Sequence, residues 1–186
     1  MMDASHKQLL VTLKNTFSDR TVTCGSDSYK VHKNIVVCSR TEFFARAMRF
    51  GGKEATEGIV DLPGDNPATV KRLCQWIYED DYASNADKIA GLFPCPTQPS
   101  DQGEENLLIQ AKMYEIADKY DVADLKDLVK EKFHWACTVS WNASTLSNAA
   151  HHVFSTTPEH EIGLRDTVIS TIHRTPLEGT REEAGD

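Results

Sequence analysis

A change of hydrophobic period near Val31 is the feature that most constrains the fold. Before this point "TVTC" and "SYKV" alternate apolar and polar residues, and "GSD" between them supplies turn residues, which together predict a β-hairpin. After it, apolar residues recur at helical spacing with a break around 38–41, so two short helices should follow the hairpin. The sequence therefore predicts an α+β fold.

The middle of the chain adds one more strand and a buried helix. The polar, glycine-containing stretch "GGKEATEG" is expected to be flexible, and "IVDLPGDNP" should hold a short strand closed by proline and glycine. Asp65 or Asn66 followed by Pro67 marks a helix start, since the missing N–H of proline is not needed at the first helical position. The apolar residues after it repeat at three and four, which indicates a helix buried on one side.

Helical patterns dominate the C-terminal half. One helix should begin near Glu104 and another at "YDVADLKDLVKEKF", with Asp124 as its cap. Beyond Trp135 two more amphipathic segments are joined by "STTPEHE". Three of the seven prolines fall in residues 91–105, which we expect to be a surface loop. Residues 175–186 are expected to be a flexible tail.

The N-terminal residues 1–16 are expected to form an amphipathic helix. Its apolar side chains lie at helical spacing: Leu9, Leu10 and Leu13. Charged residues interrupt this stretch, which is unlike a secretory signal, and no apolar run approaches the ~18 residues of a membrane-spanning helix. We therefore expect no membrane contact and an intracellular location, in the cytoplasm, the nucleus or both.

Composition argues against metal, cofactor and nucleic-acid binding. The five cysteines are widely spaced with no C-x-x-C pair, which is typical of reduced, buried thiols and gives little support to a zinc site. The net charge is −8, and no cluster of Lys and Arg interleaves with aromatic residues. The electrostatic attraction to a phosphate backbone is then missing, so direct nucleic-acid binding is not expected.

Residues 28–44, "SYKVHKNIVVCSRTEFF", raise the question of catalysis. A catalytic interpretation would make Cys38 a nucleophile and His32 its base, but a strand-to-helix change separates them and no known nucleophile motif appears. We expect no enzyme. His32 should instead be a structural hinge that bonds a backbone group left unpaired by the change of direction. Phe43 and Phe44 point about 100° apart, so both are buried only if their helix is covered on two sides, by the core and by a second cover such as another protein.

Two long stretches resemble the BTB (POZ) domain. They are "FSDRTVTCGSDSYKVHKNIVVCSRTEFFARAM" and "GKEATEGIVDLPGDNPATVKRLCQWIYEDDY", and the similarity resumes in "LLIQAKMYEIADKYDVADLKDLVKEKF". "CSRTEFF" and the proline-rich insertion are similar to fungal members. The resemblance implies a cluster of short helices capped by a small sheet, with the domain at 17–133 and a helical extension at 134–174.

The same resemblance implies a protein-interaction module without catalysis. Such domains commonly form homodimers through the N-terminal helix and the face near the first hairpin, where Asp19 and Lys33 match the charged pocket of the interface. Some members bind cullin-type ubiquitin ligase scaffolds or transcriptional co-regulators. Arg20 departs from the pattern, because many relatives have an apolar residue there and a buried unpaired guanidinium is costly.

Two hypotheses follow. In the first, the chain is a homodimeric adaptor that presents a helical face to another protein, with a cullin-type scaffold as one candidate. In the alternative, it is a monomeric helical scaffold or a co-regulator partner that recruits proteins through its C-terminal helices. An enzyme, in contrast, would require a reactive thiol at Cys38.

Overall fold

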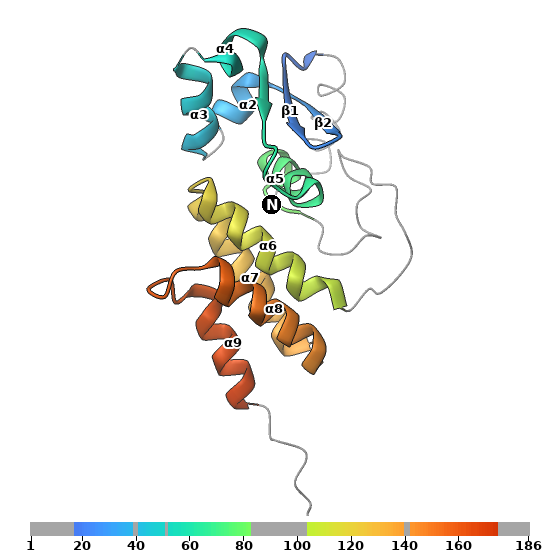
Figure 1. The fold of residues 1–186 in the computed structure, drawn as a ribbon, viewed down its shortest axis with the longest axis vertical. Helices are drawn as coiled ribbons and strands as arrows, with labels where there is room; N and C mark the ends of the chain where they lie inside the picture. Colours follow the sequence, from blue (N-terminus) through green and yellow to red (C-terminus); the bar gives the residue numbers. More distant parts are fainter. Residues whose placement is uncertain (1–16, 39–40, 51, 83–103, 140–141, 175–186) are drawn as a thin grey trace, which may run out of the picture.

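A small sheet and a stack of helices form the two ends of the molecule (Figure 1). The computed structural model describes residues 17–38, 41–50, 52–82, 104–139 and 142–174. The predicted N-terminal helix, the proline-rich loop and the C-terminal tail lie outside these residues. The fold is α+β, as the sequence predicted.

The predicted hairpin is confirmed. Strand β1 (Arg20–Cys24) pairs antiparallel with β2 (Asp27–Val31), and the turn between them contains Gly25 at a φ of 58°, which glycine adopts without strain. Strand β3 (Ile59–Asp61) pairs parallel with β1, which gives the order β2-β1-β3. Alternate side chains of β1 and β2 are buried, so one face of the sheet packs on the core.

The segment after the hairpin contains three short helices where the sequence predicted two. Helices α2 (Lys33–Cys38) and α3 (Glu42–Arg49) confirm the prediction. The expectation that "GGKEATEG" is flexible was wrong, because α4 (Lys53–Glu57) forms there. Its five residues include good helix formers, and Gly58 ends the helix at a φ of 70°.

Helix α5 (Pro67–Glu79) begins as predicted, and Asn66 is its cap. The Asn66 side chain accepts from the amides of Ala68 and Thr69, at 3.0 and 3.3 Å. The predicted apolar stripe is buried, with Val70 and Leu73 fully enclosed. In Figure 1, α5 lies between the sheet and the helical stack.

The C-terminal half consists of four helices, α6 (Glu104–Lys119), α7 (Ala123–Val139), α8 (Ala143–Thr156) and α9 (Gly163–Arg174). Helix α6 packs against α5, α7 and α8, and α9 packs against α7 and α8. The prediction of Asp124 as a cap was wrong, because this residue lies within the first turn of α7. Helix α7 also continues across the predicted domain boundary between 133 and 134, which stays a prediction.

One buried apolar cluster joins the two halves. It runs from the sheet (Val22) through α5 (Leu73) into the helical stack (Met113, Phe133 and Val168). Polar contacts reinforce this junction, since Lys132 of α7 donates to the carbonyl of Tyr82 at 2.7 Å and pairs with Asp81. The C-terminal helices are therefore packed onto the sheet-containing part as one body.

Candidate interaction groove

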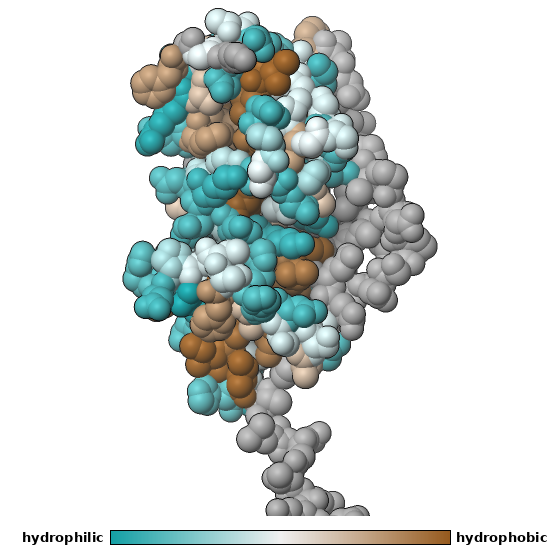
Figure 2. Space-filling view, viewed as in Figure 1, coloured by the Kyte–Doolittle hydropathy of each residue, from teal (hydrophilic) through white to brown (hydrophobic). Residues whose placement is uncertain are grey.

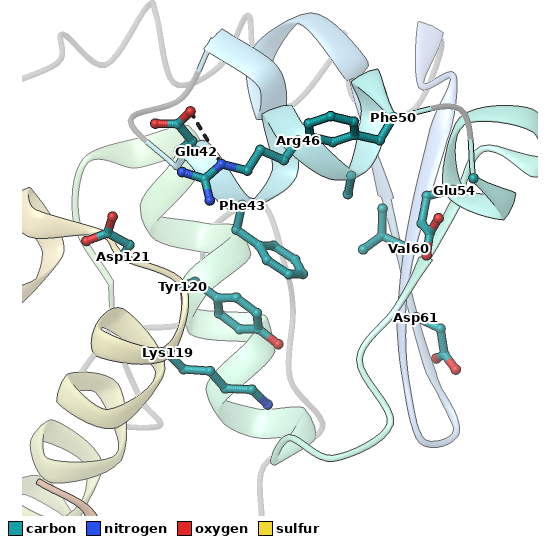
Figure 3. A pocket seen from close by; sticks show the side chains of 12 residues that line it. Glu42, Phe43, Arg46, Phe50, Glu54, Val60, Asp61, Lys119, Tyr120 and Asp121 are labelled. Atoms are coloured by element: carbon teal, nitrogen blue, oxygen red, sulfur yellow. Dashed lines mark ion pairs between the residues drawn. The ribbon is translucent and has the colours of Figure 1, made fainter.

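A groove of about 450 Å³ opens between α3, the α4–β3 segment and the turn that joins α6 to α7 (Figure 3). We call it the α3 groove. Its lining is partly aromatic and partly charged: Glu42, Phe43, Arg46, Ala47, Phe50, Gly52, Glu54, Val60, Asp61, Lys119, Tyr120 and Asp121. The groove brings together segments that are far apart in the sequence.

Aromatic rings form the floor of the α3 groove. Phe44 points into the core and is 0% exposed, whereas Phe43 is half-buried and faces the groove. The ring centroid of Phe43 lies 4.4 Å from that of Tyr120, which follows α6. The core therefore covers Phe44, and Tyr120 of the same chain provides the second cover, on the side of Phe43.

Tyr120 is held in place by Asp65. Its hydroxyl donates to Oδ2 of Asp65 at 2.5 Å, while Lys119 Nζ lies 2.8 Å from Oδ1 of the same carboxylate. Burial raises the pKa of Tyr120 strongly, and the hydrogen bond to Asp65 raises it further. These contacts fix the aromatic floor against the loop before α5.

Charged side chains line the rim. Arg46 Nε lies 3.4 Å from Glu42 Oε1 within α3. Three further carboxylates line the groove and form no ion pair with any described residue: Glu54, Asp61 and Asp121. Phe50, at the end of α3, is 82% exposed beside them. The groove thus combines an open aromatic side chain with an excess of acidic groups.

Two of the predicted dimer residues, Asp19 and Lys33, are described by the structure and do not line the α3 groove. The carboxylate of Asp19 accepts from the backbone amide of Lys33 at 2.8 Å, at the first residue of α2. Asp19 therefore satisfies a free N–H of a helix start within its own chain. No ion pair joins it to the Lys33 side chain in the part of the chain that the structure describes. Leu9, Leu10 and Leu13 lie outside that part.

Arg20 is held within its own chain. Its Nη1 donates to the carbonyl of Asp19 at 2.7 Å and lies 3.7 Å from the carboxylate. Its Nε is buried and has no hydrogen-bond partner among the described residues. The side chain passes over Gly58, where a Cβ would lie 3.2 Å from Arg20 Cδ. Gly58 is thus required both by its left-handed φ and by this close contact.

His32 lies at the junction between β2 and α2, where its ring contacts a side-chain hydroxyl; its predicted role as a hinge that bonds a backbone group stays a prediction. The amide of His32 donates to the Tyr78 hydroxyl at 2.8 Å, and Nδ1 lies 3.0 Å from the same oxygen. Burial raises the pKa of Tyr78 to about 12. The carbonyl of His32 accepts the first helical bond of α2, from Val36. The side chain of Cys38 lies outside the described part.

Comparison with known protein families gives a match to the BTB/POZ domain over residues 10–97. Residues 10–97 thus match the BTB/POZ domain, and the rest of the chain lies outside this match. BTB/POZ domains are protein–protein interaction modules, and the family is non-enzymatic. Among solved structures, the BTB (Tramtrack and Bric a brac) domain of human Gigaxonin is similar at 16% identity and a TM-score of 0.43. The alignment covers 70% of this chain and 93% of that one. No curated protein sequence matches the chain.

The α3 groove extends beyond the matched BTB/POZ domain. One wall and the floor include Lys119, Tyr120 and Asp121, which follow the matched residues 10–97. Sequence reasoning identified Phe43 as a residue in need of a second cover but did not identify Tyr120 as that cover. Nothing in the local pattern around Tyr120 distinguishes it from other apolar helix positions, so the pairing could be found only in three dimensions.

No described helix is both long and apolar enough to span a bilayer. Within the described ranges, no three His, Cys, Asp or Glu side chains gather closely enough to hold a metal ion.

Proposed function

We propose that this chain is a non-catalytic adaptor that forms a homodimer through its BTB/POZ domain and holds a second, different protein in the α3 groove. The family match supports the interaction role. The observation that carries the groove assignment is Phe50, an aromatic side chain 82% exposed at the rim of a cavity with an aromatic floor. Exposed aromatic residues beside a pocket are typical anchors of protein interfaces.

The dimer would use residues 1–16, with Leu9, Leu10 and Leu13, and the face that carries Asp19 and Lys33. Light scattering at micromolar concentration should give twice the monomer mass, and removal of residues 1–16 should give the monomer. Asp19→Asn keeps an oxygen for the Lys33 amide but removes the charge, whereas Asp19→Ala removes both. A weakened dimer in Asp19→Asn with unchanged thermal stability would assign the charge to the interface. A full chain that remains monomeric throughout would contradict the dimer.

A cullin-type scaffold is the specific partner that we propose for the α3 groove, with a transcriptional co-regulator as the other candidate. Purified chain should retain a cullin N-terminal region, and Phe50→Ala should weaken that binding roughly tenfold or more. Phe154→Ala is the matched control, because Phe154 is also an exposed aromatic residue, at 43%, but lies on α8 away from the groove. No binding at tens of micromolar would exclude the cullin.

One observation favours the alternative, recruitment through the C-terminal helices. Three isoleucines on or next to α9 are exposed: Ile162 (73%), Ile169 (44%) and Ile172 (55%). Figure 2 shows the corresponding apolar patch at the lower end of the helical stack. Leu164 and Val168 already bury the other face of α9, so these isoleucines add nothing to the described core.

The two candidate surfaces, the α3 groove and α9, predict that different partners are lost when each surface is mutated. Affinity purification should be carried out in parallel with the wild type, Phe50→Ala and the double variant Ile169→Ser/Ile172→Ser. Partners lost only with Phe50→Ala support the groove, and partners lost only with the isoleucine variant support α9. Both variants alter exposed side chains, so neither is expected to unfold the chain.

A further inference from the structure

The two walls of the α3 groove carry carboxylates that face a partner from both sides. Figure 3 shows Glu54 and Asp61 on the wall formed by α4 and β3, and Asp121 on the opposite wall. Phe43 and Tyr120 lie between them on the floor. A segment that enters the groove would therefore meet aromatic surface below and acidic groups on each side.

The two cations of the groove are already paired within the chain. Arg46 is paired with Glu42. Lys119 is paired with Asp65, whose side chain is only 11% exposed and also accepts from Tyr120. Neither cation is therefore available to neutralise the three carboxylates that form no ion pair with a described residue. The excess of negative charge remains for a partner to complement.

We infer that the α3 groove selects a protein segment in which a lysine or arginine lies within about one helical turn of a large apolar side chain. The apolar side chain would pack on Phe43 and against Phe50, and the cation would approach the carboxylates of the two walls. Opposite charges across an interface favour the correct partner, and an acidic segment would be repelled. This inference rests on the proposed function, because it describes what the groove accepts.

The expected strength of this selection follows from the exposure of the carboxylates. Asp61 and Asp121 are exposed and Glu54 is partly exposed, so each contact with a cation should change affinity only about two- to fivefold. The aromatic floor then supplies most of the affinity, and the charges decide which apolar segments are accepted. Salt should weaken the charged contribution, because the screening length falls to roughly 3 Å at 1 M.

The test is selection of random 12-residue peptides, displayed on phage, against the immobilised full chain. Binders are then compared on Ala47→Trp, which fills the groove, to identify peptides that depend on it. Affinities of the groove-dependent peptides are measured on isosteric variants that remove charge and keep shape: Glu54→Gln, Asp61→Asn and Asp121→Asn. Glu57→Gln is the matched control, because Glu57 is exposed on α4 and does not line the groove.

We expect groove-dependent peptides to pair a basic residue with an apolar one. Each wall variant should weaken their binding about two- to fivefold, while Glu57→Gln should change it less than twofold. Groove-dependent peptides without basic residues, or unaffected by the wall variants, would overturn the inference and leave the groove as a docking site. Binders that bind Ala47→Trp equally well, or failure to select any groove-dependent peptide, would overturn the groove assignment itself.

Discussion

The Asp65 carboxylate provides the sharpest test of how the two halves are joined, because its two partners should contribute differently to the free energy of unfolding. Tyr120 is 4% exposed and donates to it from within the core, whereas Lys119 pairs with it while its own side chain is 48% exposed. Removal of a buried donor from a charged acceptor costs about 1.5–3 kcal/mol, whereas an exposed ion pair contributes about 0.2–1 kcal/mol. We therefore expect Tyr120→Phe to lower the free energy of unfolding more than Lys119→Met.

Urea unfolding monitored by circular dichroism, with both variants in the same buffer, measures this difference. Tyr120→Phe should also leave affinity for a groove ligand within about twofold, because the ring that packs on Phe43 is kept. High salt should shrink the effect of Lys119→Met and leave that of Tyr120→Phe nearly unchanged. If Lys119→Met proves equally or more destabilising, the assignment of the junction to the buried hydrogen bond is refuted.

Three further outcomes test local contacts by the same unfolding assay. Asn66→Ala should lower the free energy of unfolding by about 1 kcal/mol because it removes the cap of α5, and an unchanged urea midpoint would contradict that role. Gly163→Ala should lower the free energy of unfolding by about 1–3 kcal/mol because a Cβ there would collide with the Tyr114 hydroxyl. The same substitution should cost less in a Tyr114→Phe background, and an equal cost in both backgrounds would contradict the collision. The hydrogen bond from Tyr114 is the main cause, and that from Lys126 the second, of a folded pKa of Glu161 below its ordinary value of 4.5. The ionised Glu161 therefore stabilises the folded chain fully above pH 4.5, and this contribution is lost as the pH falls through the folded pKa. The free energy of unfolding should therefore fall less steeply with decreasing pH for Glu161→Gln than for the wild type, and parallel curves would refute this.

Elements with strong local signals could be predicted from the sequence. The β1–β2 hairpin has alternating residues around a glycine turn, and α5 has Asn66 and Pro67 at its start. Each of these signals acts between neighbours, where turn and cap chemistry decide the structure. The error at α4 had the opposite cause, because the flanking glycines indicated a loop while the five residues between them favour a helix.

Contacts between distant segments could not be predicted in the same way. Tyr120 and Phe43 meet because α6 ends beside α3, and no periodic pattern encodes that approach. The hydrogen bond that Asp19 accepts from the Lys33 amide could not be predicted either, because it forms only when the hairpin brings the start of α2 back beside Asp19. Residue types therefore indicated which side chains needed a packing or hydrogen-bond partner, but the identity of that partner depended on the tertiary fold.

If a partner binds the α3 groove as proposed, its binding would be linked to the packing of the helical half. One wall and part of its floor come from Lys119, Tyr120 and Asp121, and Asp65 before α5 holds Lys119 and Tyr120. A ligand that binds only the assembled groove stabilises the contact between the two halves by mass action. Under the proposed function the C-terminal helices would contribute to recognition, and a fragment that ends at residue 97 would lack Lys119, Tyr120 and Asp121, three of the twelve residues that line the groove.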